Sequence, residues 1–248
     1  MVEINRGAVF ILKDFFDSKA GLFKADSLLK YNKVIEGRGI LPSYFLFQYI
    51  TLYFLYHETG HLVQRNQGSL DYEEFIEDEI KGKEIEERHI REHDADWFSA
   101  NQIAFHLIQF VKQEAKENDK TKFYSDLISI AEWALAGIFM YYIDRNKGKE
   151  KIYYQETTHP HPAVRLCYIV TYLLEALARN VSEKINQNTL LTNALRISEA
   201  LMMEGEINVV EKYSTALYQE IKNIDAYINK IRTDSETYPH LARKALDL

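Results

Sequence analysis

The chain has a single cysteine, Cys167, among 248 residues. One cysteine excludes an internal disulfide framework of the kind that stabilises small secreted domains, and it agrees with a reducing compartment. We therefore expect a cytoplasmic protein that is stabilised by a hydrophobic core. With 46% apolar and 27% charged residues, the composition is that of an ordinary globular protein with enough apolar material for such a core.

Glycine and proline are also scarce, with ten and four residues respectively. These residues mark turns and loops, so their scarcity argues against long linkers and favours a mainly α-helical fold. A β-strand is predicted only over residues 8–12. A helix is the alternative for this segment, because a short apolar run can form either structure. Helices are predicted around residues 22–34, from Pro42 to a C-cap at Gly68, from about Glu84, over 127–143, over 163–178 and, as two or three amphipathic segments, within 183–248.

Basic residues are outnumbered, and the net charge is −7. Because no basic stripe is present to neutralise phosphates, nucleic acid is not expected as a partner. Residues 71–92 contain ten acidic and four basic side chains. The simpler interpretation is a solvated helix face or loop. The alternative hypothesis is that part of this segment covers a cleft and selects basic substrates.

No long hydrophobic run of membrane-spanning length stands out. The N-terminus has an early acidic residue, only a short apolar stretch and no small-residue cleavage site, so it does not resemble a signal peptide. The two most apolar runs, residues 40–56 and 127–143, each span about 17 residues, at or below the length that crosses a bilayer. We interpret both as buried core helices and expect no membrane association. A membrane-associated enzyme is the alternative.

The motif that carries chemistry is His57-Glu58-Thr59-Gly60-His61, an HExxH sequence. On a helix, His57 and His61 lie one turn apart on the same face, where two imidazoles can bind zinc. Glu58 lies about 100° round the helix from His57 and is suited to act as the general base on a zinc-activated water. The metzincin continuation is absent, because Gln64 and Gln67 occupy the positions that require glycine and histidine.

Catalytic zinc usually has three protein ligands, so a third must come from elsewhere. Glu92 is the best candidate, since it opens Glu92-His93-Asp94-Ala95-Asp96, an ExxAD sequence on a second predicted helix. Asp96 lies one turn further and could accept a hydrogen bond from a ligand imidazole, which would fix its tautomer. His93 and Asp94 remain alternative ligands. Ala95 is small enough to let the two helices approach closely.

HExxH followed by ExxAD resembles the pattern of gluzincin metallopeptidases, including the HtpX and CAAX-prenyl-protease family. The downstream Thr158-His159-Pro160-His161-Pro162 and Arg165 are similar to the His-Pro motif and following arginine of those enzymes, and to the phage-exclusion protease Lit and its relatives. The resemblance covers about residues 44–170.

This resemblance implies zinc as cofactor, His57, His61 and Glu92 as its ligands, and Glu58 as general base. It implies that His159 stabilises the tetrahedral intermediate and that Arg165 orients that loop or the ligand shell. A histidine aimed at a developing oxyanion is physically suited to that role. The alternative is that His159 caps the helix after Pro162 or packs in the core.

The sequence thus predicts a zincin-like helix pair in a metallopeptidase domain over residues 1–180, with a C-terminal helical extension over 181–248 packed on it. The expected activity is zinc-dependent hydrolysis of an intracellular protein or peptide substrate. The competing hypothesis is a zinc-stabilised interaction protein whose peptidase chemistry is lost. Its working surface would be the C-terminal helices.

Overall fold

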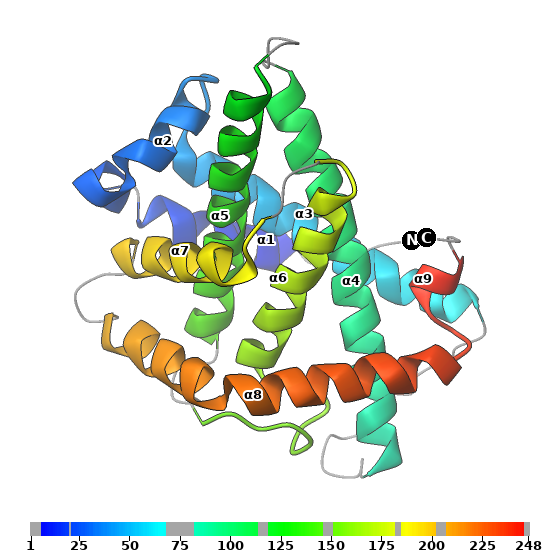
Figure 1. Ribbon diagram of the computed structural model, residues 1–248. Helices are drawn as coiled ribbons and strands as arrows, with labels where there is room; N and C mark the ends of the chain where they lie inside the picture. The colour runs from blue at the N-terminus through cyan, green and yellow to red at the C-terminus, as the bar shows by residue number, and fades with distance from the viewer. Residues whose placement is uncertain are drawn as a thin grey trace.

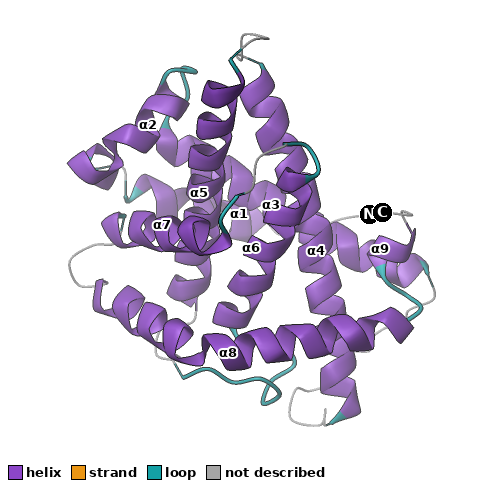
Figure 2. Cartoon of the chain, in the orientation of Figure 1, coloured by secondary structure: helices purple, strands orange, loops and turns teal. Residues whose placement is uncertain are grey.

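The computed structural model describes residues 6–19, 21–67, 82–113, 119–145, 151–181, 185–201 and 207–245. Every regular element in these ranges is a helix and none is a strand (Figures 1 and 2), so the predicted mainly α class is confirmed. The elements are α1 (Arg6–Asp17), two short 3-10 helices η1 (Leu22–Lys24) and η2 (Asp26–Leu28), α2 (Leu29–Glu36), α3 (Pro42–Asn66), α4 (Lys83–Lys112), α5 (Lys120–Arg145), α6 (Pro162–Ala178), α7 (Gln187–Ala200), α8 (Ile207–Thr237) and α9 (Ala242–Ala245).

The predicted strand over residues 8–12 is wrong, because this segment belongs to helix α1. The burial pattern gives the reason: Leu12 and Phe16 are buried, whereas Phe10 and Ile11 are exposed. A spacing of four residues between buried positions is the period of a helix, not of a strand.

Helices α3 and α4 cross directly beside the predicted ligands. α3 begins with Pro42 in its first turn and ends at Asn66, with Gln67 as C-cap, and the predicted cap Gly68 lies outside the described residues. At the crossing, a Cβ added to Gly60 would lie 3.1 Å from Ala95 Cα. The absence of a side chain at Gly60 and the small one at Ala95 therefore allow the close approach of the two helices.

The apolar run at 127–143 lies in α5. Among the described helices, α5 is the one long and apolar enough to cross a membrane, and 83% of its most apolar 18-residue window is buried by the rest of the protein. Trp133 is fully buried and stacks on Phe23 with the ring centroids 5.7 Å apart. Glu132, within the same run, accepts a hydrogen bond from Asn193 Nδ2 at 2.6 Å. The helix is buried as the core-helix interpretation requires.

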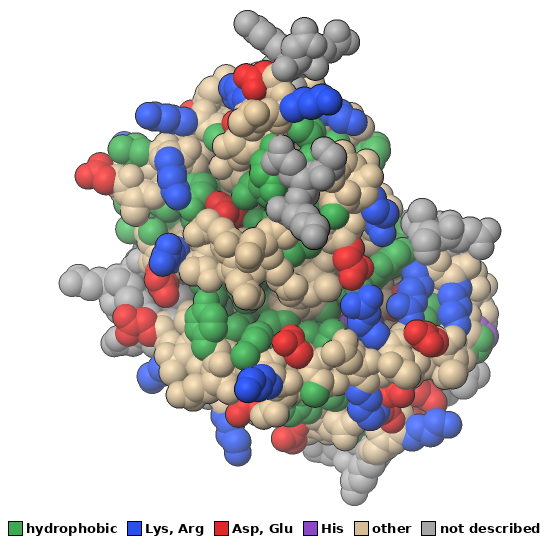
Figure 3. Space-filling view, in the orientation of Figure 1, with side chains coloured by type: hydrophobic (Ala, Val, Ile, Leu, Met, Phe, Trp, Pro, Cys, Tyr) green, Lys and Arg blue, Asp and Glu red, His purple; other side chains and the backbone are tan. Residues whose placement is uncertain are grey.

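The C-terminal helices pack against the middle of the chain. α8 passes across α4 and α6, and the short α9 returns to contact α3 and α4 (Figure 1). Buried apolar residues of α7 and α8 belong to the same hydrophobic cluster as those of α3 to α6. On the face drawn in Figure 3, acidic and basic side chains are interspersed, and hydrophobic side chains are visible between α7 and α8. The domain boundary at 180/181 stays a prediction.

Candidate metal centre

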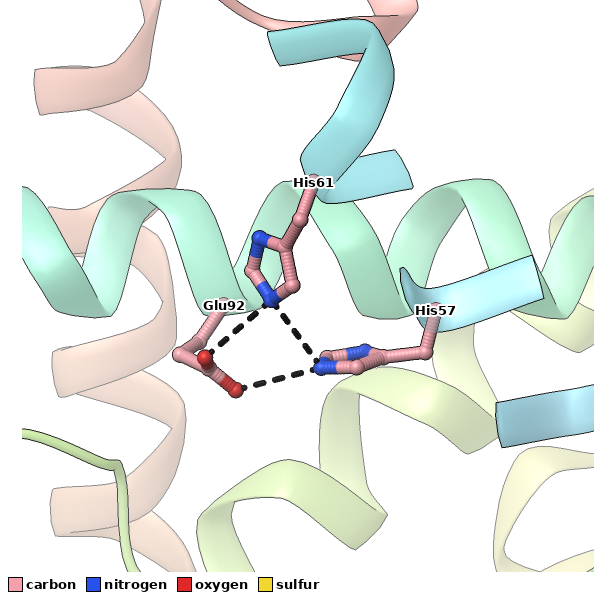
Figure 4. A group of neighbouring side chains, drawn as sticks. All are labelled: His57, His61 and Glu92. Atoms are coloured by element: carbon pink, nitrogen blue, oxygen red, sulfur yellow. Dashed lines mark hydrogen bonds and ion pairs between the residues drawn. The ribbon is translucent and has the colours of Figure 1, made fainter. Parts of the chain in front are cut away.

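Three side chains from two helices converge at the α3–α4 crossing (Figure 4). His57 and His61 project from α3, and their Nε2 atoms lie 3.2 Å apart. Glu92 projects from α4, with Oε2 3.4 Å from His57 Nε2 and Oε1 3.3 Å from His61 Nε2. The one-turn spacing on α3 aligns the two imidazoles, and the helix crossing brings the carboxylate to them.

These separations fit a tetrahedral metal ion. For metal–ligand bonds of 2.0–2.1 Å, the edges of a zinc tetrahedron are about 3.3–3.4 Å long. The three measured separations between the nitrogen and oxygen atoms lie at 3.2–3.4 Å. Two imidazoles and one carboxylate also form the ligand set of catalytic zinc, with a fourth position left for water or substrate. The residues present therefore fit the metal that the sequence predicts.

Asp96 lies one turn after Glu92 on α4 and is fully buried beside the His57 ring. Its Oδ1 lies 2.9 Å from His57 Nδ1, which leaves Nε2 directed toward Glu92 and His61. Burial by itself lowers the pKa of His57, but the carboxylates of Asp96 and Glu92 outweigh it and raise the pKa to about 9. The two carboxylates thus favour a positive charge at the position of the imidazoles.

Arg165 of α6 joins the two carboxylates. Its Nε and Nη2 donate to the Asp96 carboxylate at 2.8 and 2.7 Å, and Nη1 lies 3.1 Å from Glu92 Oε2. Burial alone raises the pKa of Asp96 and of Glu92, but Arg165 and His57 reverse this, lowering the pKa of Asp96 to about 2 and that of Glu92 well below its ordinary value. Both carboxylates stay ionised, and the Arg165 guanidinium lies between them.

Gln64 is a site residue that the sequence reasoning did not find. Its Oε1 lies 3.0 Å from His61 Nδ1, and its Nε2 donates to Asp94 Oδ2 at 2.8 Å and to the Arg91 carbonyl at 3.0 Å. The amide therefore fixes the orientation of His61 as Asp96 fixes that of His57. The sequence signal for this role is a side-chain amide three residues after a ligand histidine, a spacing that places both side chains on one helix face.

The alternative ligands His93 and Asp94 point elsewhere. His93 Nε2 lies 2.5 Å from the Tyr172 hydroxyl, and burial lowers the pKa of this histidine to about 3. Asp94 accepts hydrogen bonds from Gln64 and from the backbone N–H of Ala242 at 2.6 Å. Both side chains are fully buried in packing contacts with α6, α3 and α9, which leaves Glu92 to face the imidazoles.

The two residues predicted to be catalytic lie at the periphery. Glu58 is exposed on α3 and is not among the residues that line the adjacent cavity. The His159 side chain is 60% exposed, with Nε2 3.7 Å from Glu92 Oε1 and Nδ1 3.1 Å from Thr158 Oγ1. The helix-capping role belongs to His161, whose Nδ1 accepts from Ala163 N at 3.0 Å.

A cavity of about 210 Å³ opens beside the three ligands. Its walls come from α3, α4 and the loop before α6. The lining residues are His61, Gln64, Arg65, Arg88, Arg91, Glu92, Thr158 and His159. Two of the three ligand residues therefore face a space that a substrate can enter.

Comparisons with protein-family models, with curated proteins and with solved structures find no match to this chain.

Proposed function

We propose that this protein is a zinc-dependent endopeptidase that hydrolyses a peptide bond of an intracellular protein substrate. The observation that carries the proposal is the convergence of His57, His61 and Glu92 at separations of 3.2–3.4 Å beside a cavity. The agreement with the HExxH and ExxAD spacings supports it. When bound there, zinc would lower the pKa of a water ligand to about 7 and polarise the substrate carbonyl.

The surrounding residues would divide the remaining tasks. Glu58 would take a proton from the attacking water and return it to the leaving amine. Its carboxylate is exposed and so open to water. His159 lies beside Glu92 at the cavity and would donate a hydrogen bond to the developing oxyanion. Asp96 and Gln64 would hold the two imidazoles with Nε2 free to bind the metal.

The test is a comparison of wild type with Glu58→Gln. General acid–base catalysis contributes roughly 10²–10⁴-fold, so the variant should lose hydrolysis by at least 100-fold while retaining one zinc per chain. Mapping of new protein termini in cells that express each form gives the activity, and plasma emission spectroscopy gives the metal content. Glu36→Gln, an exposed glutamate on α2, is the matched control. Undiminished cleavage by Glu58→Gln would refute the mechanism.

The second candidate function is that of a zinc-stabilised interaction protein without peptidase activity. The observation in its favour is that Glu58 does not line the cavity. Under this hypothesis, His61→Ala loses the metal and lowers the thermal stability, but neither wild type nor Glu58→Gln generates new termini. Metal loss combined with loss of cleavage would decide for the enzyme.

A further inference from the structure

The cavity beside the metal ligands has a strongly cationic wall. Arg65, Arg88 and Arg91 contribute to its lining, and its single carboxylate, Glu92, is one of the three proposed ligands. The whole chain carries a net charge of −7. Arg65 of α3 and Arg88 and Arg91 of α4, together called the arginine wall below, are therefore a local reversal of the overall charge, at the place where a substrate would lie.

The position of this wall follows from helix periodicity. Arg65 lies four residues after His61 on α3, and Arg88 lies four residues before Glu92 on α4. Residues spaced by four occupy the same face of a helix, with Cβ atoms about 5–6 Å apart. Each helix thus presents an arginine one turn away from a proposed ligand. Consecutive Cα atoms of a peptide are 3.8 Å apart, so a substrate side chain that reached these arginines would lie one or two residues from a bond cleaved at the metal.

Arg91 is held in a fixed position on this wall. Its Nε donates to the Tyr238 hydroxyl at 2.7 Å, and its guanidinium lies 5.4 Å from the centre of the Tyr238 ring. The side chain is buried, with 7% of its surface exposed. A buried guanidinium braced by a neutral hydroxyl keeps its charge and loses little freedom when an anion binds.

Two acidic side chains near the start of α4, Glu86 and Glu87, are paired with lysines. Glu86 forms an ion pair with Lys230 of α8, and Glu87 lies 3.9 Å from Lys83. The hypothesis that this region covers the cleft and selects basic substrates concerns residues 71–92, of which 71–81 lie outside the described residues. The described part places Arg88 and Arg91, not its first-turn glutamates, along the cavity.

We propose that this arginine wall binds a carboxylate of the substrate next to the scissile bond, and so makes the protein selective for acidic peptides. Guanidinium groups pair with carboxylates through two parallel hydrogen bonds, which gives both charge and geometric selection. The volume of about 210 Å³ is below the 300–1,000 Å³ of typical small-molecule sites and suits a single side chain or a chain terminus. The inference rests on the proposed peptidase function.

The experiment measures peptide binding separately from hydrolysis. Full-length, zinc-loaded Glu58→Gln protein is titrated with three fluorescein-labelled, alanine-rich hexapeptides, and binding is followed by fluorescence anisotropy. The first probe is amidated and has one central glutamate, the second is amidated with glutamine instead, and the third has glutamine and a free C-terminal carboxylate. The same titrations are repeated with Glu58→Gln protein that also carries both Arg65→Gln and Arg88→Gln. The control is Glu58→Gln protein that also carries Arg196→Gln, a substitution of an exposed arginine on α7.

We expect the glutamate probe to bind at least tenfold more tightly than its glutamine counterpart. This preference should vanish in the double arginine variant and persist with Arg196→Gln. Tight binding of the free-carboxylate probe in place of the glutamate probe would identify a chain terminus as the source of the carboxylate. Equal binding of all three probes, or an undiminished preference in the double variant, would overturn the inference.

The outcomes also separate this inference from the proposed function. Probe discrimination without any hydrolysis by wild type would leave the carboxylate site standing and reject the peptidase. Hydrolysis without probe discrimination would leave the peptidase and reject the carboxylate site. Unchanged melting temperatures of the arginine variants would confirm that they fold.

Discussion

The contact between Gly60 and Ala95 gives the sharpest test of the site geometry. A Cβ added at Gly60 would lie 3.1 Å from Ala95 Cα and 3.3 Å from Ala95 Cβ. Carbon atoms in ordinary contact are about 3.5–4.0 Å apart, so Gly60→Ala requires α3 and α4 to separate by about 0.4 Å. His57 and His61 move with one helix, and Glu92 moves with the other.

Such a displacement matters more to a metal site than to the core. Metal–ligand distances must hold to about 0.2 Å, and a separation of about 0.4 Å exceeds that tolerance. Alanine is favoured over glycine in a helix by about 1 kcal/mol, which offsets the strain of the tighter contact. We therefore expect Gly60→Ala to fold with a melting temperature within a few degrees of wild type but to bind zinc about 10–100-fold more weakly, the scale of a disturbed ligand shell.

The assay is competition for zinc against a chromogenic chelator, with the melting temperature of the metal-free protein recorded in parallel. Gly21→Ala is the matched control, because a Cβ there meets no atom within 4 Å. The double variant Gly60→Ala with Ala95→Gly removes the 3.3 Å contact with Ala95 Cβ but keeps the 3.1 Å contact with the Cα of residue 95, so it should recover little of the affinity. Wild-type zinc affinity in Gly60→Ala would refute the claim that this crossing sets the ligand geometry.

Three further predictions concern single side chains. Gln64→Met removes the acceptor of the His61 Nδ1 proton and should lower zinc affinity about 10–100-fold in the same competition assay; a change of less than twofold would contradict the positioning role. Asn186→Ala removes the N-cap of α7, whose Oδ1 accepts from Thr189 N at 3.0 Å, and should lower the free energy of unfolding by about 1 kcal/mol in urea titrations while leaving zinc affinity unchanged. Burial raises the pKa of Cys167 to about 12, so the folded protein should resist iodoacetamide at pH 8 and react only after denaturation, as read by mass spectrometry.

The parts of the site that lie within one helix could be predicted from the sequence. His57 and His61 share a face because they are four residues apart, and Glu92 and Asp96 share a face for the same reason. The structure places all four together. Helix boundaries were also accessible where Pro42 and Pro162 begin helices, since proline is tolerated in the first turn.

The parts that depend on packing between distant segments were not accessible. Nothing local to Gln64 requires it to contact Asp94, which lies 30 positions away. Arg165 was assigned to the ligand shell through the family resemblance alone, and nothing local to it reveals that it joins two carboxylates on α4. The strand error at residues 8–12 has a different cause. A five-residue apolar run is too short to show its period, and only the wider pattern that includes Phe16 identifies a helix.

The hydrogen bond from Ala242 to Asp94 has a consequence for the order in which the protein is assembled. Asp94 contacts Gln64, which holds His61. The other partners of Asp94 are the backbone N–H groups of Ala242 and Arg243 on α9, 148 and 149 positions further along the chain. A chain emerging from the ribosome contains both histidines long before it contains Ala242. The support of His61 is therefore complete only when the C-terminal segment has docked. The site therefore acquires its final geometry late in synthesis, after the segment around Ala242 has been made.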